Sequence, residues 1–140
     1  MLTTPWMLVT AAVTILAVIF YMVTAWRTGS MREKHGIAAP AVAGHPQFER
    51  AYRVQMNTLE AMPVFLPVLW IGAYYFTKVP LLAPALGLVW IVGRVVYMQA
   101  YMADPSKRSL GFAISALATV ALLLIAIAGI VMSWSGTIST

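Results

Sequence analysis

Two sets of polar side chains recur at helical spacing in a sequence that is otherwise apolar. The members of the first set are three, four and three positions apart: Arg50, Arg53, Asn57 and Glu60. At about 3.6 residues per turn they line one face of a helix, and Gln55 points to the other side. Ionised groups at membrane depth are rare and usually face a bundle interior or a wet cavity. This set therefore predicts one wall of a polar site.

The second set repeats the same intervals further along the chain: Arg94, Tyr97, Tyr101 and Asp104. Two polar stripes on neighbouring helices imply a shared pocket. The turn after the second stripe adds a further basic residue, Arg108. Because arginines outnumber carboxylates in and beside the two stripes, we expect a cationic, hydrogen-bonding cleft that accepts an anion and opens toward the cytoplasm.

A purely structural interpretation of the same residues is that they satisfy one another. Glu49 can pair with Arg53 at i,i+4, and Glu60 can neutralise an arginine of the second stripe. Arg94, midway along a predicted span, suits helix pairing through Glu60 as well as ligand contact. The excess of positive charge favours a ligand for the set as a whole.

Composition places these stripes in a membrane protein. Of 140 residues, 61% are hydrophobic and 9% are charged, whereas soluble domains carry about a quarter charged residues. A span needs about 20 apolar residues, so the chain has room for four spans and short loops. The net charge of +5 comes from bases beside spans, which fix topology rather than bind nucleic acid.

Two residue types restrict the chemistry. Cysteine is absent, so any thiol must come with a ligand. The two histidines, His35 and His45, have no third candidate ligand at metal spacing, and we expect no metal.

Polar breaks divide the chain into helices. Polar segments at residues 28–46, 78–80 and 104–108 interrupt the apolar sequence, and Pro105 disfavours helical geometry at Asp104. We predict one all-α transmembrane domain over residues 1–140, a four-helix bundle with helices at about 5–27, 47–77, 80–103 and 109–134.

Basic residues also predict the orientation of the bundle. They concentrate in loops 28–46 and 104–108, so these loops are expected in the cytoplasm and both termini on the opposite side. Short loops and compact size favour a bacterial inner membrane over an endoplasmic reticulum.

The first stripe lies in a longer motif that resembles a known family. Residues 48–60, FERAYRVQMNTLE, followed by Pro63 and Phe65, are similar to the signature of the MAPEG family, membrane-associated proteins in eicosanoid and glutathione metabolism. Residues 90–97, WIVGRVVY, with Tyr101 and residues 104–109, DPSKRS, resemble the third type of microsomal glutathione transferase and the leukotriene-C synthase branch. The resemblance covers nearly the whole chain.

The resemblance implies a homotrimer that binds glutathione, its co-substrate, between subunits near the cytoplasmic surface. Matched residue by residue, the expected glutathione contacts are Arg53, Asn57, Glu60, Tyr97, Tyr101, Gln55 and Arg32. Gln55 matches a position that reaches the adjacent subunit's ligand. Arg108 matches the arginine that activates the thiol, and is the expected catalytic residue. This sequence departs from the family pattern at two positions. Ala61 stands where the leukotriene synthase has tyrosine, and Gln55 stands where third-type transferases have histidine. These differences affect the expected strength of glutathione binding and the choice of electrophile.

The implied chemistry is consistent with the side chains present. Arginines can hold glutathione carboxylates in bidentate fashion, and Glu60 can accept from its ammonium. A free thiol titrates near a pKa of about 8.5, and only the thiolate is a good nucleophile. A guanidinium about 4 Å from sulfur offers up to about 4 kcal/mol at an effective dielectric of about 20. Half of that lowers the thiol pKa by about 1.5 units.

The sequence therefore predicts a membrane-bound glutathione S-transferase that joins the thiolate to lipophilic electrophiles, with glutathione peroxidase activity on lipid hydroperoxides as a second activity. The alternative is a non-catalytic lipid-binding scaffold, like the lipoxygenase-activating branch. A scaffold does not need a thiol activator such as Arg108. A transporter would need an internal repeat or a polar path across the bilayer, and residues 109–134 offer neither.

Overall fold

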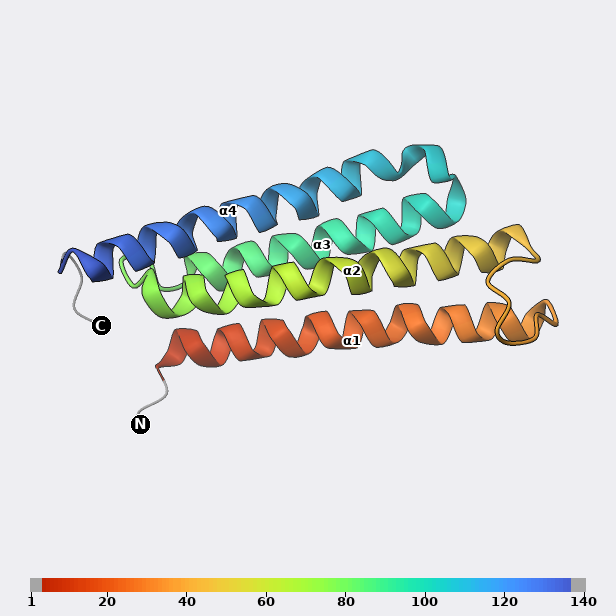
Figure 1. The fold of residues 1–140 in the computed structure, drawn as a ribbon, viewed down its shortest axis with the longest axis horizontal. Helices are drawn as coiled ribbons and strands as arrows, with labels where there is room; N and C mark the ends of the chain where they lie inside the picture. Colours follow the sequence, from red (N-terminus) through yellow and green to blue (C-terminus); the bar gives the residue numbers. More distant parts are fainter. Residues whose placement is uncertain (1–3, 137–140) are drawn as a thin grey trace.

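The computed structural model describes residues 4–136, which form four long helices and one short 3-10 helix (Figure 1). The elements are α1 (Pro5–Lys34), α2 (Pro46–Tyr75), α3 (Leu82–Ala103), η1 (Pro105–Arg108) and α4 (Ser109–Trp134). All four long helices are long and apolar enough to cross a membrane. A helix suits lipid because it satisfies its backbone hydrogen bonds internally. The predicted all-α fold with four spans is confirmed.

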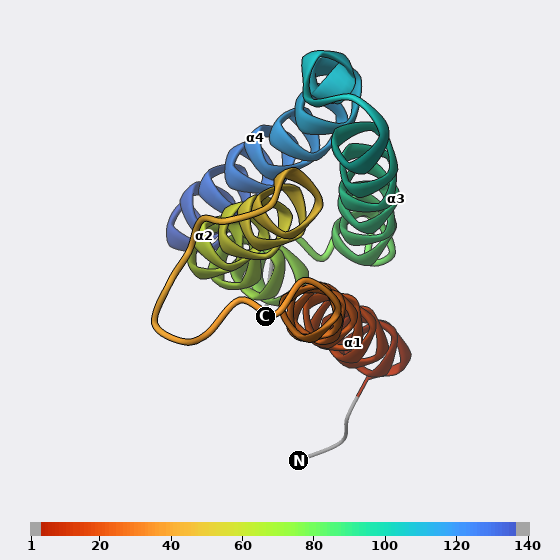
Figure 2. The same cartoon turned by 90° about the vertical axis from the view of Figure 1, so that its right-hand side faces the viewer.

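The helices run antiparallel along one long axis. The loop between α1 and α2 lies at the same end as η1, and the start of α1 lies at the other end with the end of α4 (Figure 1). Viewed along the bundle, α2 lies between α1 and α4 (Figure 2). Because α2 packs against each of the other long helices, its two faces can serve different neighbours.

The main departure from the predicted boundaries is the end of α1. This helix continues to Lys34 rather than ending near residue 27, so the loop expected at residues 28–46 shrinks to 35–45. Thr28 is buried in the extension and donates a hydrogen bond to the Thr24 carbonyl at 3.0 Å. The change to polar composition after Trp26 therefore does not mark the end of the helix. The remaining helix boundaries agree within two residues.

The shortened loop is held against the start of α2. Arg32 donates to the Ala41 carbonyl at 2.8 Å, and its guanidinium lies 4.6 Å from the centre of the Phe48 ring. The His35 and His45 rings stack with centroids 3.5 Å apart, and the His45 side chain caps α2. These contacts fix the entry into the helix that carries the first polar stripe.

Glycines set the spacing between helices around the site. A Cβ added at Gly111 would overlap the Tyr97 backbone nitrogen, and one at Gly93 would lie 2.6 Å from the Ser115 nitrogen. Thus α3 and α4 touch backbone to backbone beside Tyr97. Far from η1, a Cβ at Gly129 would lie 2.7 Å from the Phe76 nitrogen, so α4 also meets the end of α2 closely.

Candidate functional site

A cavity of about 550 Å³ lies between α2, α3, η1 and the start of α4. Side chains from both polar stripes line it together with three residues that follow α3: Arg53, Asn57, Tyr97, Tyr101, Arg108, Ser109 and Phe112. The structure therefore brings five of the predicted site residues around one space. Two members of each predicted stripe therefore line one cavity.

Two tyrosines form the wall on α3. Tyr97 and Tyr101 are one turn apart and both buried, and their ring centroids lie 5.5 Å from each other. The Arg108 guanidinium carbon lies 5.8 Å from the centre of the Tyr101 ring. The close approach of α4 at Gly111 holds this wall near the turn that carries Arg108.

Asp104 does not line the cavity but caps the turn that does. Its Oδ1 accepts hydrogen bonds from the Ser106 nitrogen at 3.0 Å and the Ser106 hydroxyl at 2.8 Å. These bonds, with the nearby charges of Lys107 and Arg50, lower the pKa of Asp104. An ionised Asp104 therefore stabilises η1, and η1 ends at Arg108.

The electrostatic character of the cavity is cationic. Among the described residues its lining includes two guanidinium groups, Arg53 and Arg108, and no carboxylate. Both arginines are exposed in the single subunit, so a water-soluble anion can reach them. Arginine presents a rigid fork of N–H donors that matches carboxylate geometry. Such a cavity can bind a ligand with carboxylate groups and stabilise a second anionic centre beside Arg108.

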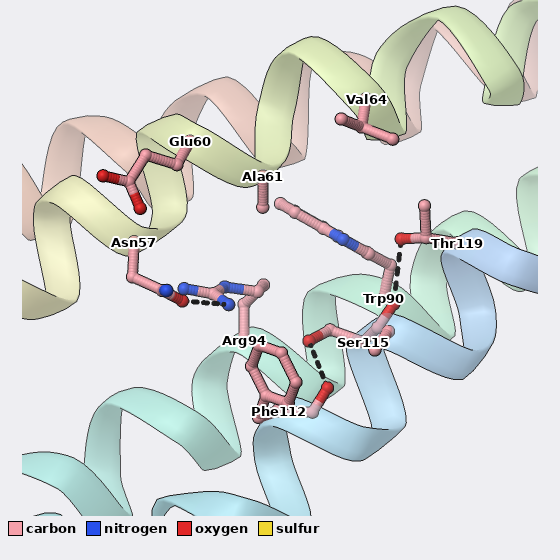
Figure 3. A pocket seen from close by; sticks show the side chains of 10 residues that line it. Asn57, Glu60, Ala61, Val64, Trp90, Arg94, Phe112, Ser115 and Thr119 are labelled. Atoms are coloured by element: carbon pink, nitrogen blue, oxygen red, sulfur yellow. Dashed lines mark hydrogen bonds between the residues drawn. The ribbon is translucent and has the colours of Figure 1, made fainter.

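Two smaller hollows adjoin this cavity. One of about 340 Å³ shares Asn57 and Phe112 with it and extends between α2 and α4, where Glu60, Trp90 and Arg94 also line it (Figure 3). Glu60 therefore lies next to the cavity, one helical turn beyond Asn57. The other hollow, of about 400 Å³, shares Arg53 and Tyr101 and lies beside the loop at residues 42–46.

Gln55 and Arg32 stand outside the cavity lining. The intermediate exposure of Gln55 fits its predicted place on the other side of α2. Arg32 is engaged with the carbonyls of residues 37, 38 and 41 in its own loop. Their predicted ligand contacts stay predictions.

The ion pairs of the structural interpretation do not form within residues 4–136. Glu49 accepts a hydrogen bond from the Gly44 nitrogen at 2.9 Å instead of meeting Arg53. Arg94, which is 1% exposed, donates to Asn57 and Thr58 and not to Glu60. Within residues 4–136, the predicted partners therefore do not neutralise Arg53 and Glu60 of the first stripe.

Sequence reasoning missed residues that depend on tertiary packing. Ser109 and Phe112 line the cavity from α4; the signals for them were that Ser109 follows Arg108 directly and that Phe112 lies one helical turn later. Arg50 belongs to the first stripe, yet its Nη1 donates to the carbonyls of Met102 and Ala103, both at 3.1 Å. It ties α2 to the end of α3 and lines the hollow beside the loop, not the 550 Å³ cavity.

Residues 10–128 match the MAPEG family. The chain belongs to the MAPEG family. The matched region contains all of the predicted site residues, from Arg32 to Arg108.

Individual MAPEG relatives place the chain more finely. It is 44% identical to microsomal glutathione S-transferase 2 of Mus musculus over 105 residues, which is 75% of this chain and 70% of the relative. It is 42% identical to an uncharacterized protein of Synechocystis over 113 residues, 81% of each chain. It is 33% identical to leukotriene C4 synthase of Cavia porcellus over 120 residues, 86% of this chain and 79% of the relative. The resemblance to the transferase and leukotriene synthase branch of MAPEG proteins is confirmed.

Proposed function

We propose that this MAPEG protein is a membrane-bound glutathione S-transferase that joins the glutathione thiolate to lipophilic electrophiles. One observation carries the proposal: Arg53, Tyr97 and Arg108, from three elements, line the same cavity. Relatives named as glutathione transferase and leukotriene C4 synthase support a glutathione-dependent activity. The cavity volume of about 550 Å³ is in the usual range for small-molecule sites, about 300–1,000 Å³.

The residues divide the work of binding glutathione. Arg53 holds a carboxylate, Tyr97 and Tyr101 supply hydroxyl groups, and Asn57 faces both the cavity and the adjoining hollow. Glu60, whose side chain makes no hydrogen bond or ion pair within residues 4–136, accepts from the ligand's ammonium group. The protein forms a homotrimer in which Arg32 and Gln55 also contact glutathione. Gln55 reaches the ligand of the adjacent subunit, so α2 contributes to two neighbouring sites.

Arg108 is the catalytic residue of the proposed reaction. Its permanent positive charge stabilises the thiolate relative to the thiol, which releases its proton to solvent. The sulfur then attacks an electrophilic carbon, and the new C–S bond displaces a leaving group or opens an epoxide whose oxygen takes a proton. With a lipid hydroperoxide, sulfur attacks the terminal peroxide oxygen; a second glutathione completes reduction to an alcohol, water and glutathione disulfide.

The second substrate reaches the site from the bilayer. Large apolar side chains are exposed along the outside of α4, among them Leu117 at 68% and Leu124 at 61%. We place the loops at residues 28–46 and 104–108 in the cytoplasm, which contains glutathione. Both ends of the chain then lie on the opposite side of the membrane. A bacterial inner membrane suits this topology.

A direct test assays the purified protein in detergent with glutathione against a panel of electrophiles and hydroperoxides. Mass spectrometry of the products should show glutathione conjugates with at least one lipophilic electrophile. Peroxide consumption with formation of glutathione disulfide would measure the second activity. If glutathione binds to the protein without turnover, or does not bind at all, the lipid-binding scaffold becomes the better assignment.

A further inference from the structure

Arg94 occupies an unusual position for an arginine. It lies in the middle of α3, is 1% exposed, and has no carboxylate partner among residues 4–136. Its Nη1 donates to Asn57 Oδ1 at 3.0 Å and its Nη2 to Thr58 Oγ1 at 2.9 Å. Its Nε is buried without a hydrogen-bond partner. A buried cation is costly unless its donors are satisfied, so the two bonds to α2 have a large influence on how α2 and α3 meet.

The bond to Asn57 fixes which way that amide points. Arginine has only N–H donors, so the Asn57 atom that faces it must be the oxygen. This removes the usual ambiguity between the oxygen and nitrogen of an asparagine side chain. Figure 3 shows the Asn57 side chain reaching from α2 to the Arg94 guanidinium on α3. The amide nitrogen of Asn57, with two N–H groups, is left for the cavity that Asn57 lines.

Thr58 accepts the second hydrogen bond of the Arg94 guanidinium but is not a cavity residue. Its hydroxyl donates to the Val54 carbonyl at 2.8 Å, which leaves its oxygen free to accept from Arg94. Thr58 is fully buried and does not line the cavity. The Arg94 guanidinium carbon also lies 4.5 Å from the centre of the Tyr97 ring. Arg94 thus contacts two residues of the 550 Å³ cavity without lining it, although it does line the adjoining hollow of about 340 Å³.

We propose that Arg94 is a positioning residue that makes Asn57 a hydrogen-bond donor toward a carbonyl or carboxylate oxygen of glutathione. This inference rests on the proposed function, since it names a further determinant of the same site. It predicts that glutathione binding requires a hydrogen-bond donor at position 57, and not only a side chain of the same size.

The test separates positioning from structural support by two variants with opposite effects. Asn57→Asp keeps an acceptor for Arg94 and makes that bond charge-assisted, so the melting temperature should hold or rise. The same variant turns a donor toward the ligand into an acceptor. We expect the Kd for glutathione to rise by about tenfold or more, as for a lost bond to a charged group.

A second variant weakens the positioning bond itself. In Arg94→Lys a single ammonium replaces the fork that reaches Asn57 and Thr58 together. We expect about a tenfold higher KM for glutathione, with kcat within about twofold, because Asn57 contributes uniform binding. Thr58→Val is the matched control: it removes the other acceptor of Arg94, so it should lower the melting temperature while KM stays unchanged.

The outcomes distinguish this inference from the proposed function. If the wild-type protein shows no saturable glutathione binding, the proposed function fails and the Arg94 assignment fails with it. If the wild type binds glutathione and Asn57→Asp binds it equally well, only the Arg94 assignment is overturned, and this holds even if Arg94→Lys does not fold.

Discussion

At the residue scale, the charge of the cavity comes from side chains far apart in the sequence. Arg53 reaches it from α2, and Arg108 reaches it from the end of η1. We propose different roles for them, since the Arg108 guanidinium carbon lies 5.8 Å from the centre of the Tyr101 ring. Lys107, the neighbour of Arg108 on the same turn, is exposed and does not line the cavity. This pair of adjacent cations allows a matched comparison.

Replacing Arg108 by alanine should slow conjugation by raising the pKa of bound glutathione. About 2 kcal/mol of lost thiolate stabilisation corresponds to about a 30-fold lower rate at pH values below the wild-type thiol pKa, and to a smaller loss at higher pH. If Arg108 lowers the thiol pKa in the wild type, activity should rise with pH and level off near neutrality. In Arg108→Ala the plateau should move up by about 1.5 pH units.

The pH profile of kcat with a generic electrophile measures this shift. Lys107→Ala removes the same charge one position away and should leave both the rate and the profile close to wild type. Equal pH profiles for the wild type and Arg108→Ala would show that Arg108 does not activate the thiol.

At the element scale, the site depends on how closely α4 approaches α3. Gly111 allows that approach because a Cβ there would overlap the backbone of Tyr97. Asp104 and Ser106 close the turn between the two helices, and Arg50 ties the end of α3 to α2. The position of Arg108 is therefore set by helix packing and capping around it.

Gly111→Ala should force α4 away from α3 and disturb the cavity. Overpacking of this kind costs about 1–3 kcal/mol, so the protein should melt at a lower temperature and lose conjugating activity. Gly29→Ala is the control, because a Cβ there meets nothing within 4 Å. As a helix residue of α1, it should be neutral or gain up to about 1 kcal/mol. Thermal unfolding in detergent compares the two, and wild-type stability of Gly111→Ala would contradict the packing.

The helices and the two polar stripes could be predicted from sequence because both follow from local periodicity. The cavity could be predicted only as a convergence of stripes. Periodicity does not show which side chains on different helices bond to each other. Arg94 bonds to Asn57 instead of Glu60, and Arg50 bonds to the end of α3. The end of α1 was missed because polar residues such as Arg32 continue a helix as well as they form a loop.

At the scale of the whole molecule, the cavity is accompanied by two hollows that continue along α2. The exposure of Arg53, Glu60 and Arg108 leaves these spaces open at the surface of a single subunit. We propose that a homotrimer covers them and brings Gln55 of one subunit to the site of the next.

Subunit complementation tests this arrangement. Gln55→Ala and Arg108→Ala should each impair activity when expressed alone. If the two residues serve one site from different subunits, random mixed trimers should restore about a quarter of the wild-type sites. Native mass spectrometry in detergent gives the assembly state in parallel. No recovery of activity in verified mixed trimers would place both residues in sites of a single subunit.

The most direct test of the central claim is isothermal titration of glutathione into the purified protein, with Arg53→Ala as the comparison. If α2, α3 and η1 form one anion-accepting cavity, the wild type should give saturable heat and Arg53→Ala should bind at least tenfold more weakly, about 1.4 kcal/mol. No heat from the wild type at millimolar glutathione, or equal binding by both proteins, would contradict the account.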